Sequence, residues 1–341
     1  MEESVGVTIS ENEAAAAAQK IGQLRAALQQ VLFGQETLID HVVTGLLARG
    51  HLLLEGLPGL GKTELVKGLS KTLGLEAKRV QFTPDLLPGD ITGNPMLQDT
   101  PEGRAFVFQP GPLFANLVLA DEINRASPKT QSALLEAMQE RRVTVMGQTH
   151  PLPNPFFVLA TQNPIELEGT YPLPEAQLDR FLFKLEVRSI SAETLERIVL
   201  NREIGEEPKV TAVLDGDELR ALLDQVRRVF MPQPVASFIA RLVHATQPGG
   251  AAAEGVKYGA SPRAALALAA AAKARALAAG RVNAAYEDVR ALSPAVLRHR
   301  LLLDYRARLE GITPDTVVAR LLESVPAQDA PLPDSLRAAK I

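Results

Sequence analysis

The chain has 341 residues, of which 46% are hydrophobic and 22% charged, proportions that exclude a disordered, collagen-like or low-complexity chain and predict about two globular domains. It has no cysteine, which excludes disulfides, thiol nucleophiles, iron–sulfur clusters and cysteine-ligated zinc, and favours a reducing compartment. The net charge of −4 argues against a dedicated nucleic-acid coat protein, although it allows a local basic groove.

The amino-terminal 20 residues are acidic and lack the basic-then-apolar order of a secretory signal. The longest apolar run, residues 264–272, is far shorter than the roughly 18 residues that a membrane-spanning helix requires. We therefore expect a soluble, cytoplasmic chain without a membrane span.

Strands alternate with helices in the first half of the chain. Apolar periodicity predicts two helices, then a buried strand that ends in glycine and proline, and a regular alternation after it. Such alternation predicts a parallel α/β sheet. The predicted helices are 11–32, 36–49, 61–73 and 128–139; the predicted strands are 51–55, 79–82, 117–120 and 156–160; residues 83–95 are predicted to be irregular, and 142–152 to form a β-hairpin.

Helical periodicity dominates beyond residue 189. The predicted helices are 192–204, 217–229, 234–246, 261–279, 286–292, 294–303 and 315–324, with glycine and proline at the breaks. We therefore predict two domains, an α/β core over residues 1–189 and an all-α domain over 190–341. Acidic residues outnumber basic ones by six in the first part, whereas basic residues outnumber acidic ones by two in the second.

Residues 56–63, GLPGLGKT, match the phosphate-binding loop G-x-x-x-x-G-K-[ST] and lie between a predicted strand and a predicted helix. Glycines let consecutive backbone N–H groups surround phosphates, and the helix amino terminus adds partial positive charge. Lys62 would reach the β- and γ-phosphates, and the Thr63 hydroxyl would bind Mg²⁺. The alternative is an ordinary glycine-rich turn. The predicted contacts to ATP are Gly56, Pro58, Gly59, Leu60, Gly61, Lys62, Thr63 and Glu64.

Two adjacent carboxylates follow the predicted strand 117–120. Ligands bind at the carboxyl ends of strands in open α/β sheets, so Asp121 would help to hold Mg²⁺ and Glu122 would take the proton from the attacking water. The alternative is a solvated helix start with favourably placed acids. Beside a phosphate loop, the catalytic interpretation is preferred.

Asn163 follows the predicted strand 156–160. An amide at the tip of a strand beside the phosphate-loop strand would orient the attacking water and contact the γ-phosphate. Asn163 precedes Pro164, so a turn initiated by Asn-Pro is the alternative. Its place in the series of strand ends favours the catalytic role.

Together these residues resemble the AAA+ ATPases, and within them the MoxR family. The resemblance rests on GLPGLGKT at 56–63, LVLADEINRASPKTQSALLEAMQE at 117–140, VLATQNPIE at 158–166 and YPLPEAQLDRFLFK at 171–184, and it continues through residues 33–36, 261–263 and 297–300. It spans about residues 20–326. It implies a P-loop NTPase core with strand order 5-1-4-3-2, an α-helical lid, and a homo-hexameric ring with ATP at the subunit interfaces.

The resemblance also implies roles for residues outside the phosphate loop. Arg180 occupies the position of the arginine finger, which acts on the neighbouring subunit's γ-phosphate, and Arg263 that of the lid's second sensor, which contacts the same subunit's nucleotide. Gly34 and Gln35 resemble the segment that lines the adenine pocket. The alternatives are a surface arginine paired with Asp179 or Glu175, and an ordinary helix-start arginine.

Three functions are open at this point. The resemblance implies an ATP- and Mg²⁺-dependent chaperone that remodels or matures client proteins, works with a partner bearing a von Willebrand factor A domain, and contacts clients through residues 84–95 and 142–152. Ordinary loop packing is the alternative for those segments. A nucleic-acid motor or loader is the second function, because residues 241–308 are basic, although a neighbouring acidic core explains that charge equally well. A nucleotide-switched scaffold with little turnover is the third.

Overall fold

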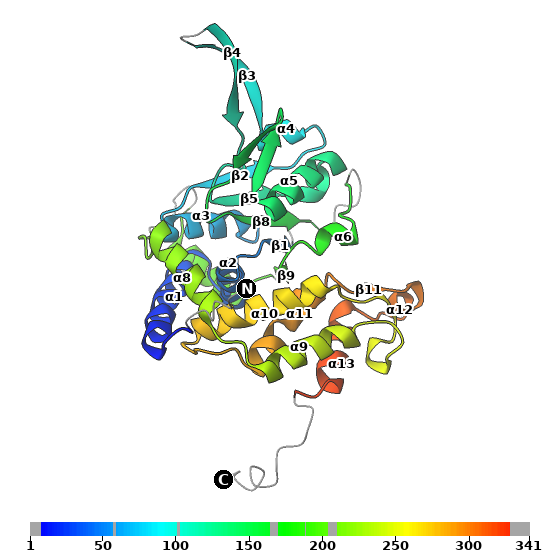
Figure 1. Ribbon diagram of the computed structural model, residues 1–341. Coiled ribbons are helices and arrows are strands. Elements are labelled where there is room, and N and C mark those ends of the chain that lie inside the picture. The colour runs from blue at the N-terminus through cyan, green and yellow to red at the C-terminus, as the bar shows by residue number, and fades with distance from the viewer. Residues whose placement is uncertain are drawn as a thin grey trace, which may run out of the picture.

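A computed structural model describes residues 8–56, 59–100, 103–163, 170–187, 189–203 and 210–327. Figure 1 shows an upper α/β part with a projecting hairpin and a lower helical part. No helix in the described ranges has both the length and the apolar character needed to cross a membrane.

A parallel five-stranded sheet forms the centre of the upper part. Its strands are β1 (Leu52–Glu55), β2 (Ala77–Gln81), β5 (Leu117–Asp121), β8 (Phe157–Gln162) and β9 (Phe183–Glu186), arranged in the order β2-β5-β8-β1-β9. Numbered along the chain, these five strands give 5-1-4-3-2, so the expected order is confirmed. The strand β9 was not among the strands predicted from hydropathy.

Apolar side chains leave both faces of this sheet and enter two cores. Leu52, Leu54 and Leu119 point to the side covered by the helices α1 (Glu11–Val31), α2 (Glu36–Leu47) and α3 (Lys62–Leu73), whereas Leu53 and Val118 point to the side of α5 (Pro128–Glu140). Burial on both faces explains the continuous apolar runs in the sequence. The same sandwich aligns the carboxyl ends of β1, β5 and β8 at one edge.

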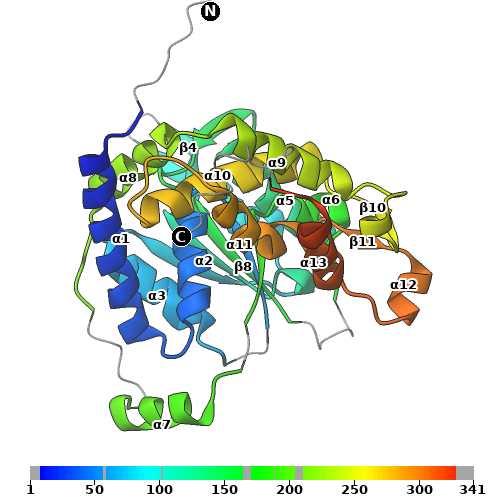
Figure 2. The ribbon, with the colours of Figure 1, turned by 90° about the horizontal axis from the view of Figure 1, so that it is seen from below.

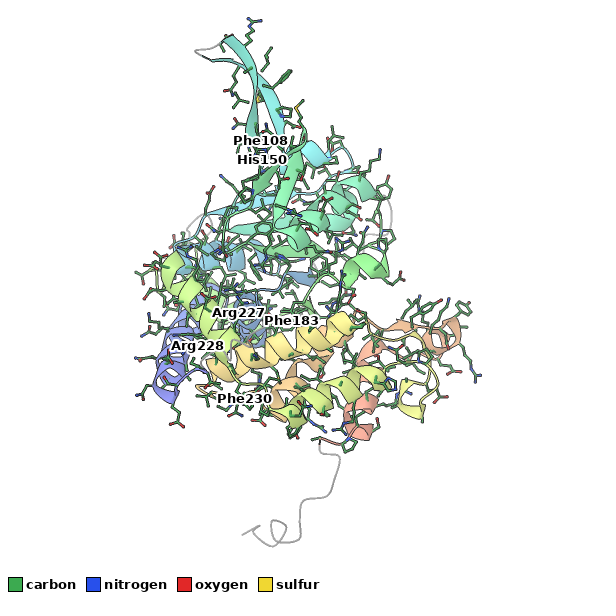
Figure 3. All side chains as sticks on the ribbon, in the orientation of Figure 1. Phe108, His150, Phe183, Arg227, Arg228 and Phe230 are labelled. Atoms are coloured by element: carbon green, nitrogen blue, oxygen red, sulfur yellow. The ribbon has the colours of Figure 1, made fainter. Side chains whose placement is uncertain are left out.

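The prediction that residues 83–95 are irregular is wrong for the second half of this segment. A short helix α4 (Pro88–Thr92) leads into an antiparallel hairpin of β3 (Gly93–Thr100) and β4 (Gly103–Pro110), which projects from the core (Figure 1). Side chains along β4 are mostly exposed, so the hairpin lacks the alternation that marks a half-buried strand. The Phe108 ring stacks on His150, with centroids 4.0 Å apart (Figure 3).

His150 belongs to the second hairpin, β6 (Arg142–Val145) and β7 (Gln148–Pro151), and the prediction of a hairpin there is confirmed. The Phe108–His150 contact joins the two hairpins. The remaining short elements of this part are a 3₁₀ turn (Ile123–Arg125) and α6 (Glu175–Leu178).

The lower part is helical, as expected, with one small exception. Its helices are α7 (Ala192–Asn201), α8 (Gly216–Arg228), α9 (Gln233–Ala245), α10 (Pro262–Ala278), α11 (Tyr286–Leu297), α12 (Tyr305–Leu309) and α13 (Pro314–Ser324), with a 3₁₀ turn (Ala251–Ala253). Two short strands, β10 (Val256–Tyr258) and β11 (Leu302–Leu303), pair antiparallel, so the all-α expectation needs this correction. Figure 2 shows α10 beside α1 and α2, and α7 apart from the other helices.

The predicted break between helices 286–292 and 294–303 is also wrong. Pro294 lies inside α11, which continues to Leu297. A proline removes one backbone hydrogen bond from a helix, but buried Leu292, Ala295 and Val296 hold both sides of it against the core. Apolar residues from α1, α2 and the lower helices form one continuous core; a domain boundary at residues 189 and 190 stays a prediction.

His51, just before β1, provides a pH-dependent element of the fold. It is buried; Nε2 donates to the Met138 carbonyl at 3.0 Å, and Nδ1 accepts from the Val158 N–H at 3.0 Å. Burial lowers the pKa of His51 from 6.5 to about 4. The unfolded chain therefore takes up this proton near pH 6.5, whereas the folded chain does so only near pH 4.

We expect the free energy of unfolding to fall as pH drops from about 6.5 to 4, with a contribution from His51 of about 3 kcal/mol. Denaturant titrations at several pH values would measure this. In His51→Gln, whose side chain does not titrate, the fall over that range should be smaller. Equal slopes in both proteins would contradict the assignment to His51.

Candidate nucleotide-binding site

The phosphate loop connects β1 to α3, and two of its glycines have the left-handed backbone that the turn requires. Gly59 has φ 82° and Gly61 has φ 81°, a region that disfavours other residues. A Cβ on Gly61 would lie 2.5 Å from a Leu32 methyl carbon. Pro58, a predicted contact, lies outside the described residues.

Lys62, the first residue of α3, lies within this loop. Its ammonium donates to the Gly56 carbonyl at 2.7 Å. Burial lowers the pKa of Lys62, while the nearby carboxylates of Asp121 and Glu122 act in the opposite direction. The lysine charge and both carboxylates therefore share one partly buried site.

One cavity of about 360 Å³ brings together most of the predicted catalytic residues. It lies at the carboxyl edge of the sheet, where β1, β2, β5 and β8 end. Its lining residues are Gly59, Gly61, Lys62, Thr63, Glu64, Arg79, Gln81, Asp121, Glu122 and Asn163. Lys62 and Thr63, at the start of α3, thus lie around the same cavity as Asp121, Glu122 and Asn163, which lie at or just beyond the ends of β5 and β8.

A buried threonine holds the two carboxylate residues in place. The hydroxyl of Thr161, which is fully buried, donates to Asp121 Oδ1 at 2.6 Å and accepts from the Glu122 backbone N–H at 2.9 Å. Arg79 donates to Asp121 Oδ2 at 2.8 Å. Thr161 therefore fixes the side chain of Asp121 and the backbone of Glu122.

The Glu122 side chain is held on the β2 side of the cavity. Its Oε2 accepts from Gln81 Nε2 at 2.8 Å and from Arg125 at 3.0 Å. Glu122 also has φ 54°, a left-handed conformation that is uncommon for a residue other than glycine. Strained residues concentrate at functional sites, which is consistent with a catalytic position here.

A second cavity of about 260 Å³ adjoins the first and shares Gly59, Gly61 and Glu64 with it. Its other lining residues are mostly apolar: Val31, Leu32, Phe33, Gln35, Leu60, Ile190, Ile198, Arg202 and Glu203. A polar cavity joined to an apolar one suits a nucleotide, with phosphates in the first and the base in the second.

Gln35 lines this apolar cavity, whereas Gly34 does not. Gly34 lines the neighbouring cleft toward α11, and with φ 68° it packs against Thr194, whose Oγ1 would lie 2.6 Å from an added Cβ. Two arginines lie over the Phe33 ring, with Arg197 5.2 Å and Arg202 5.4 Å from its centroid. Both arginines come from α7 or its end, so α7 closes this side of the apolar cavity.

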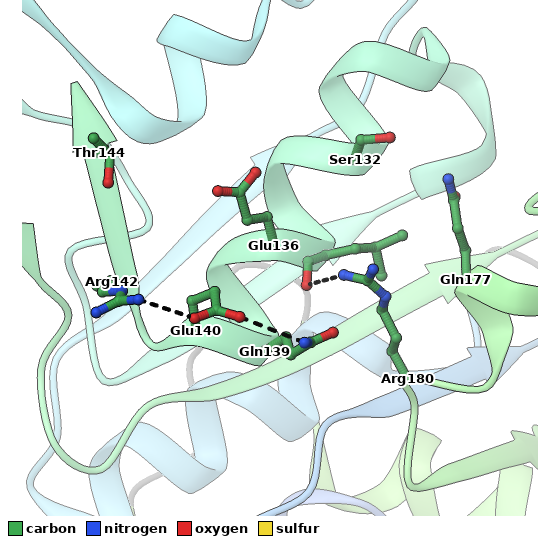
Figure 4. A pocket seen from close by; sticks show the side chains of 9 residues that line it. Ser132, Glu136, Gln139, Glu140, Arg142, Thr144, Gln177 and Arg180 are labelled. Atoms are coloured by element: carbon green, nitrogen blue, oxygen red, sulfur yellow. Dashed lines mark hydrogen bonds and ion pairs between the residues drawn. The ribbon is translucent and has the colours of Figure 1, made fainter. Parts of the chain in front are cut away.

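Arg180 lies in a different cavity, of about 400 Å³, against α5 and β6 (Figure 4). Its guanidinium donates to the Leu135 carbonyl at 3.1 Å, and its buried Nε has no hydrogen-bond partner among the described residues. Glu136, Glu140 and Arg142 also line this cavity. None of its lining residues lines the phosphate-loop cavity of the same chain.

Arg263 lies near Asp179, with its guanidinium 4.0 Å from the carboxylate. Asp179 precedes β9, and Leu182 N–H donates to the His51 carbonyl just before β1, so this segment lies toward the amino ends of the strands, away from the phosphate loop. Arg263 lines neither cavity around the phosphate loop, so its expected contact with the same subunit's nucleotide stays a prediction that this arrangement does not support. The start of α10 in the lid therefore lies beside Asp179, the residue that precedes Arg180.

The comparisons with known proteins agree with this arrangement. Residues 51–183 match the ATPase family associated with various cellular activities (AAA), and residues 250–321 match the AAA lid domain. The chain is 44% identical to Chaperone MoxR1 of Mycobacterium tuberculosis over 304 residues, covering 87% of this chain and 80% of the relative. It is 31% identical to Protein MoxR of Methylorubrum extorquens over 323 residues, covering 88% and 93%.

The chain belongs to the MoxR family of AAA+ ATPases. YeaC of Bacillus subtilis is 42% identical over 306 residues, covering 89% of this MoxR-family chain and 94% of YeaC. A crystal structure of a candidate ATPase from Cytophaga hutchinsonii superimposes with a TM-score of 0.86 at 38% identity, covering 93% of this chain and 97% of that one. The AAA+ core, the helical lid and the family are thus established.

Two residues of this MoxR-family site, Thr161 and Gln81, were not predicted from the sequence. Both are polar residues near the carboxyl ends of sheet strands, β8 and β2, and this position is the signal that could have found them. Thr161 lies inside β8 at the end of its apolar run, two residues before Asn163. Gln81 belongs to the edge strand β2, which carries only a weak apolar signal.

Proposed function

We propose that this MoxR-family ATPase binds ATP with Mg²⁺, hydrolyses it in a ring of identical subunits, and uses the turnover to remodel or mature client proteins. The observation that carries the ATPase proposal is the single cavity that holds Lys62, Thr63, Asp121, Glu122 and Asn163. It places a cation, a hydroxyl, two carboxylates and an amide around one space, the set that phosphoryl transfer to water uses.

The donor set fits Mg²⁺, which prefers oxygen ligands. The Thr63 hydroxyl and the Asp121 carboxylate would hold the ion, which when bound would neutralise charge on the β- and γ-phosphates. Lys62 would pair with those phosphates, and Asn163 would orient the attacking water. Glu122 would accept the proton of that water as its oxygen bonds to the γ-phosphorus, and the bond to the β-phosphate oxygen breaks to leave ADP.

The ring proposal rests on Arg180 and Arg263. Both lie away from the phosphate-loop cavity of their own chain. We infer that both arginines face the γ-phosphate of the next subunit, where the charge of a finger stabilises the transition state.

The chaperone role is supported by family membership and by the β3–β4 hairpin. Met96, Leu97 and Phe106 on this hairpin are each more than half exposed. Exposed apolar side chains on a projecting element suit contact with a protein client. A partner with a von Willebrand factor A domain, a hexameric ring and a cytoplasmic location stay predictions.

The nucleic-acid alternative is weakened by ion pairs that lid arginines make within the chain. Several lid arginines are neutralised within the chain: Arg281 pairs with Asp288, Arg298 with Glu186 and Asp315, and Arg300 with Asp179. Paired arginines contribute little to a basic binding surface. Tight DNA binding in a gel shift that weakens steeply with salt would favour the motor instead.

Phosphate release at micromolar protein, with and without Mg²⁺, tests the proposal. We expect Mg²⁺-dependent turnover that rises per subunit as the protein concentration increases, because each site needs a neighbouring Arg180. ATP binding without measurable turnover, by a ring whose size is verified by light scattering, would support the scaffold instead.

Thr161 should control how tightly Mg²⁺ is held during turnover. Thr161→Val keeps the shape but removes the hydroxyl bonded to Asp121 and Glu122, and loss of such an orienting partner weakens metal binding by about 10- to 100-fold. We expect the Mg²⁺ concentration for half-maximal turnover to rise by about that factor. Thr161→Ser, which keeps the hydroxyl, is the control. An unchanged Mg²⁺ dependence in Thr161→Val would refute this role.

A further inference from the structure

The side chain of Arg300, just beyond α11, bonds mainly to the segment that precedes β9. It is 3% exposed, and its Nε donates to Asp179 Oδ1 at 2.8 Å. One terminal nitrogen donates to the carbonyls of Asp179 at 3.1 Å and Phe181 at 2.7 Å. The other donates to the carbonyls of Leu182, at 3.2 Å, and Val296. All five N–H groups of a guanidinium are thereby used.

Four of these five acceptors belong to residues 179–182, the segment that contains Arg180. His299 adds another bond, because its Nε2 donates to the Phe181 carbonyl at 3.1 Å. Burial lowers the pKa of His299 well below its usual value, so the ring is neutral and its Nε2 carries the proton. The backbone on both sides of Arg180 is therefore held by two consecutive lid residues.

A second lid element reaches the same place. Ser261, which caps α10, donates its hydroxyl to Asp179 Oδ2 at 2.8 Å and accepts from the Arg263 backbone N–H at 3.2 Å. The Asp179 carboxylate thus joins the start of α10 to the end of α11. Asp179 and the positively charged Arg300 compensate each other, as buried charges require.

We propose that Arg300 is a positioning residue for Arg180: together with Asp179 it fixes the finger segment to the lid, so that Arg180 reaches the next subunit in the correct place. This inference rests on the proposed role of Arg180 as a finger in trans. The bonds are made to backbone carbonyls on either side of Arg180, and the Arg180 side chain leaves the segment toward α5 (Figure 4).

The number of bonds explains why an arginine is needed. A lysine would keep the charge but offers three donors from one nitrogen, which cannot span the carbonyls of Asp179, Phe181 and Leu182 as a planar fork does. The finger would then lose its fixed place. Displacement of a catalytic group by about 1 Å costs about 10²-fold in rate.

Arg300→Lys is the test variant. We expect a ring made only of this variant to hydrolyse ATP about 10²-fold more slowly than the wild type. Its ATP affinity should be nearly unchanged, because the phosphate-loop cavity of each subunit is intact. Arg281→Lys is the matched control: Arg281 also pairs with a buried lid aspartate, Asp288, at 2.9 Å but has no bond to residues 179–182. It should keep its turnover. Thermal unfolding and light scattering verify fold and ring size.

Mixed rings separate positioning from general damage. An Arg300→Lys subunit keeps a working ATP site, and a Glu122→Gln subunit keeps a working finger. Mixing these two impaired proteins should restore turnover at interfaces where the Arg300→Lys subunit supplies the ATP site and the Glu122→Gln subunit supplies Arg180. Mixing Arg300→Lys with Arg180→Ala should restore nothing, because both lack a placed finger.

The reference mixture is Arg180→Ala with Glu122→Gln. If it recovers turnover and the Arg300→Lys mixture does not, the positioning role fails while the trans finger stands. If the reference mixture also fails, the proposed finger itself is overturned. Should Arg300→Lys not fold, Asp179→Asn replaces it; this variant keeps an acceptor oxygen but weakens the pair, and its mixture with Glu122→Gln should likewise recover.

Discussion

Glu122→Gln is expected to reduce ATP turnover by about 10²- to 10⁴-fold while ATP binding is retained. The reason is that glutamine keeps the size and the hydrogen-bonding oxygen of glutamate but cannot accept the proton of the attacking water, and general-base catalysis contributes about that factor. Lys62, Thr63 and the apolar cavity stay intact, so the nucleotide should still bind. Phosphate release and fluorescent-nucleotide titration measure the two effects separately.

The matched control is Glu76→Gln, a glutamate on the surface that pairs with Lys78 and lines none of the cavities around the phosphate loop. Its turnover should equal that of the wild type. A Glu122→Gln protein that hydrolyses ATP within a few-fold of the wild type would show that another group removes the proton. Loss of ATP binding together with turnover would indicate instead that the substitution disturbs the cavity.

The phosphate site was predictable from sequence because its signals are local. A phosphate loop, two acids at the end of an apolar strand and an amide at the end of another each lie within a few residues of a recognisable strand. Parallel strands then align their carboxyl ends at one edge. The cavity that unites Lys62, Asp121, Glu122 and Asn163 follows from that topology.

The parts that escaped prediction depend on contacts between distant segments or lack a burial pattern. Side chains along β4 of the β3–β4 hairpin are mostly exposed, so no apolar alternation marks this strand. Helix α11 continues through Pro294 because tertiary packing outweighs a local break. Arg263 lies beside Asp179 because of how the lid docks on the core, a geometry that no local motif encodes.

The same reasoning applies to Arg300. In sequence it is one arginine in a run of basic residues, 298–300, without any sign of burial. Its role becomes visible only when the folded chain brings it to residues 179–182. Buried arginines that bond to backbone carbonyls of a functional segment are thus a kind of positioning residue that a single sequence conceals.

Arg180→Ala should lower turnover by about 10³-fold or more with ATP affinity nearly unchanged, because a finger supplied by a neighbour contributes mainly to the transition state. In this chain Arg180 lines a cavity that shares no residue with the phosphate-loop cavity. Its removal therefore leaves the binding site of its own subunit complete. Arg306→Ala, which removes an exposed lid arginine paired with Glu310, is the control and should retain wild-type turnover.

The decisive measurement mixes Arg180→Ala with Glu122→Gln, each inactive alone. In a head-to-tail ring assembled at random from equal amounts, about one interface in four combines the intact Glu122 of one subunit with the intact Arg180 of the next. About a quarter of the wild-type turnover per subunit should return if interfaces act independently. A finger acting within its own subunit predicts no recovery at any ratio, because each subunit would still lack one of the two groups. Recovery therefore distinguishes the two arrangements without knowledge of the client.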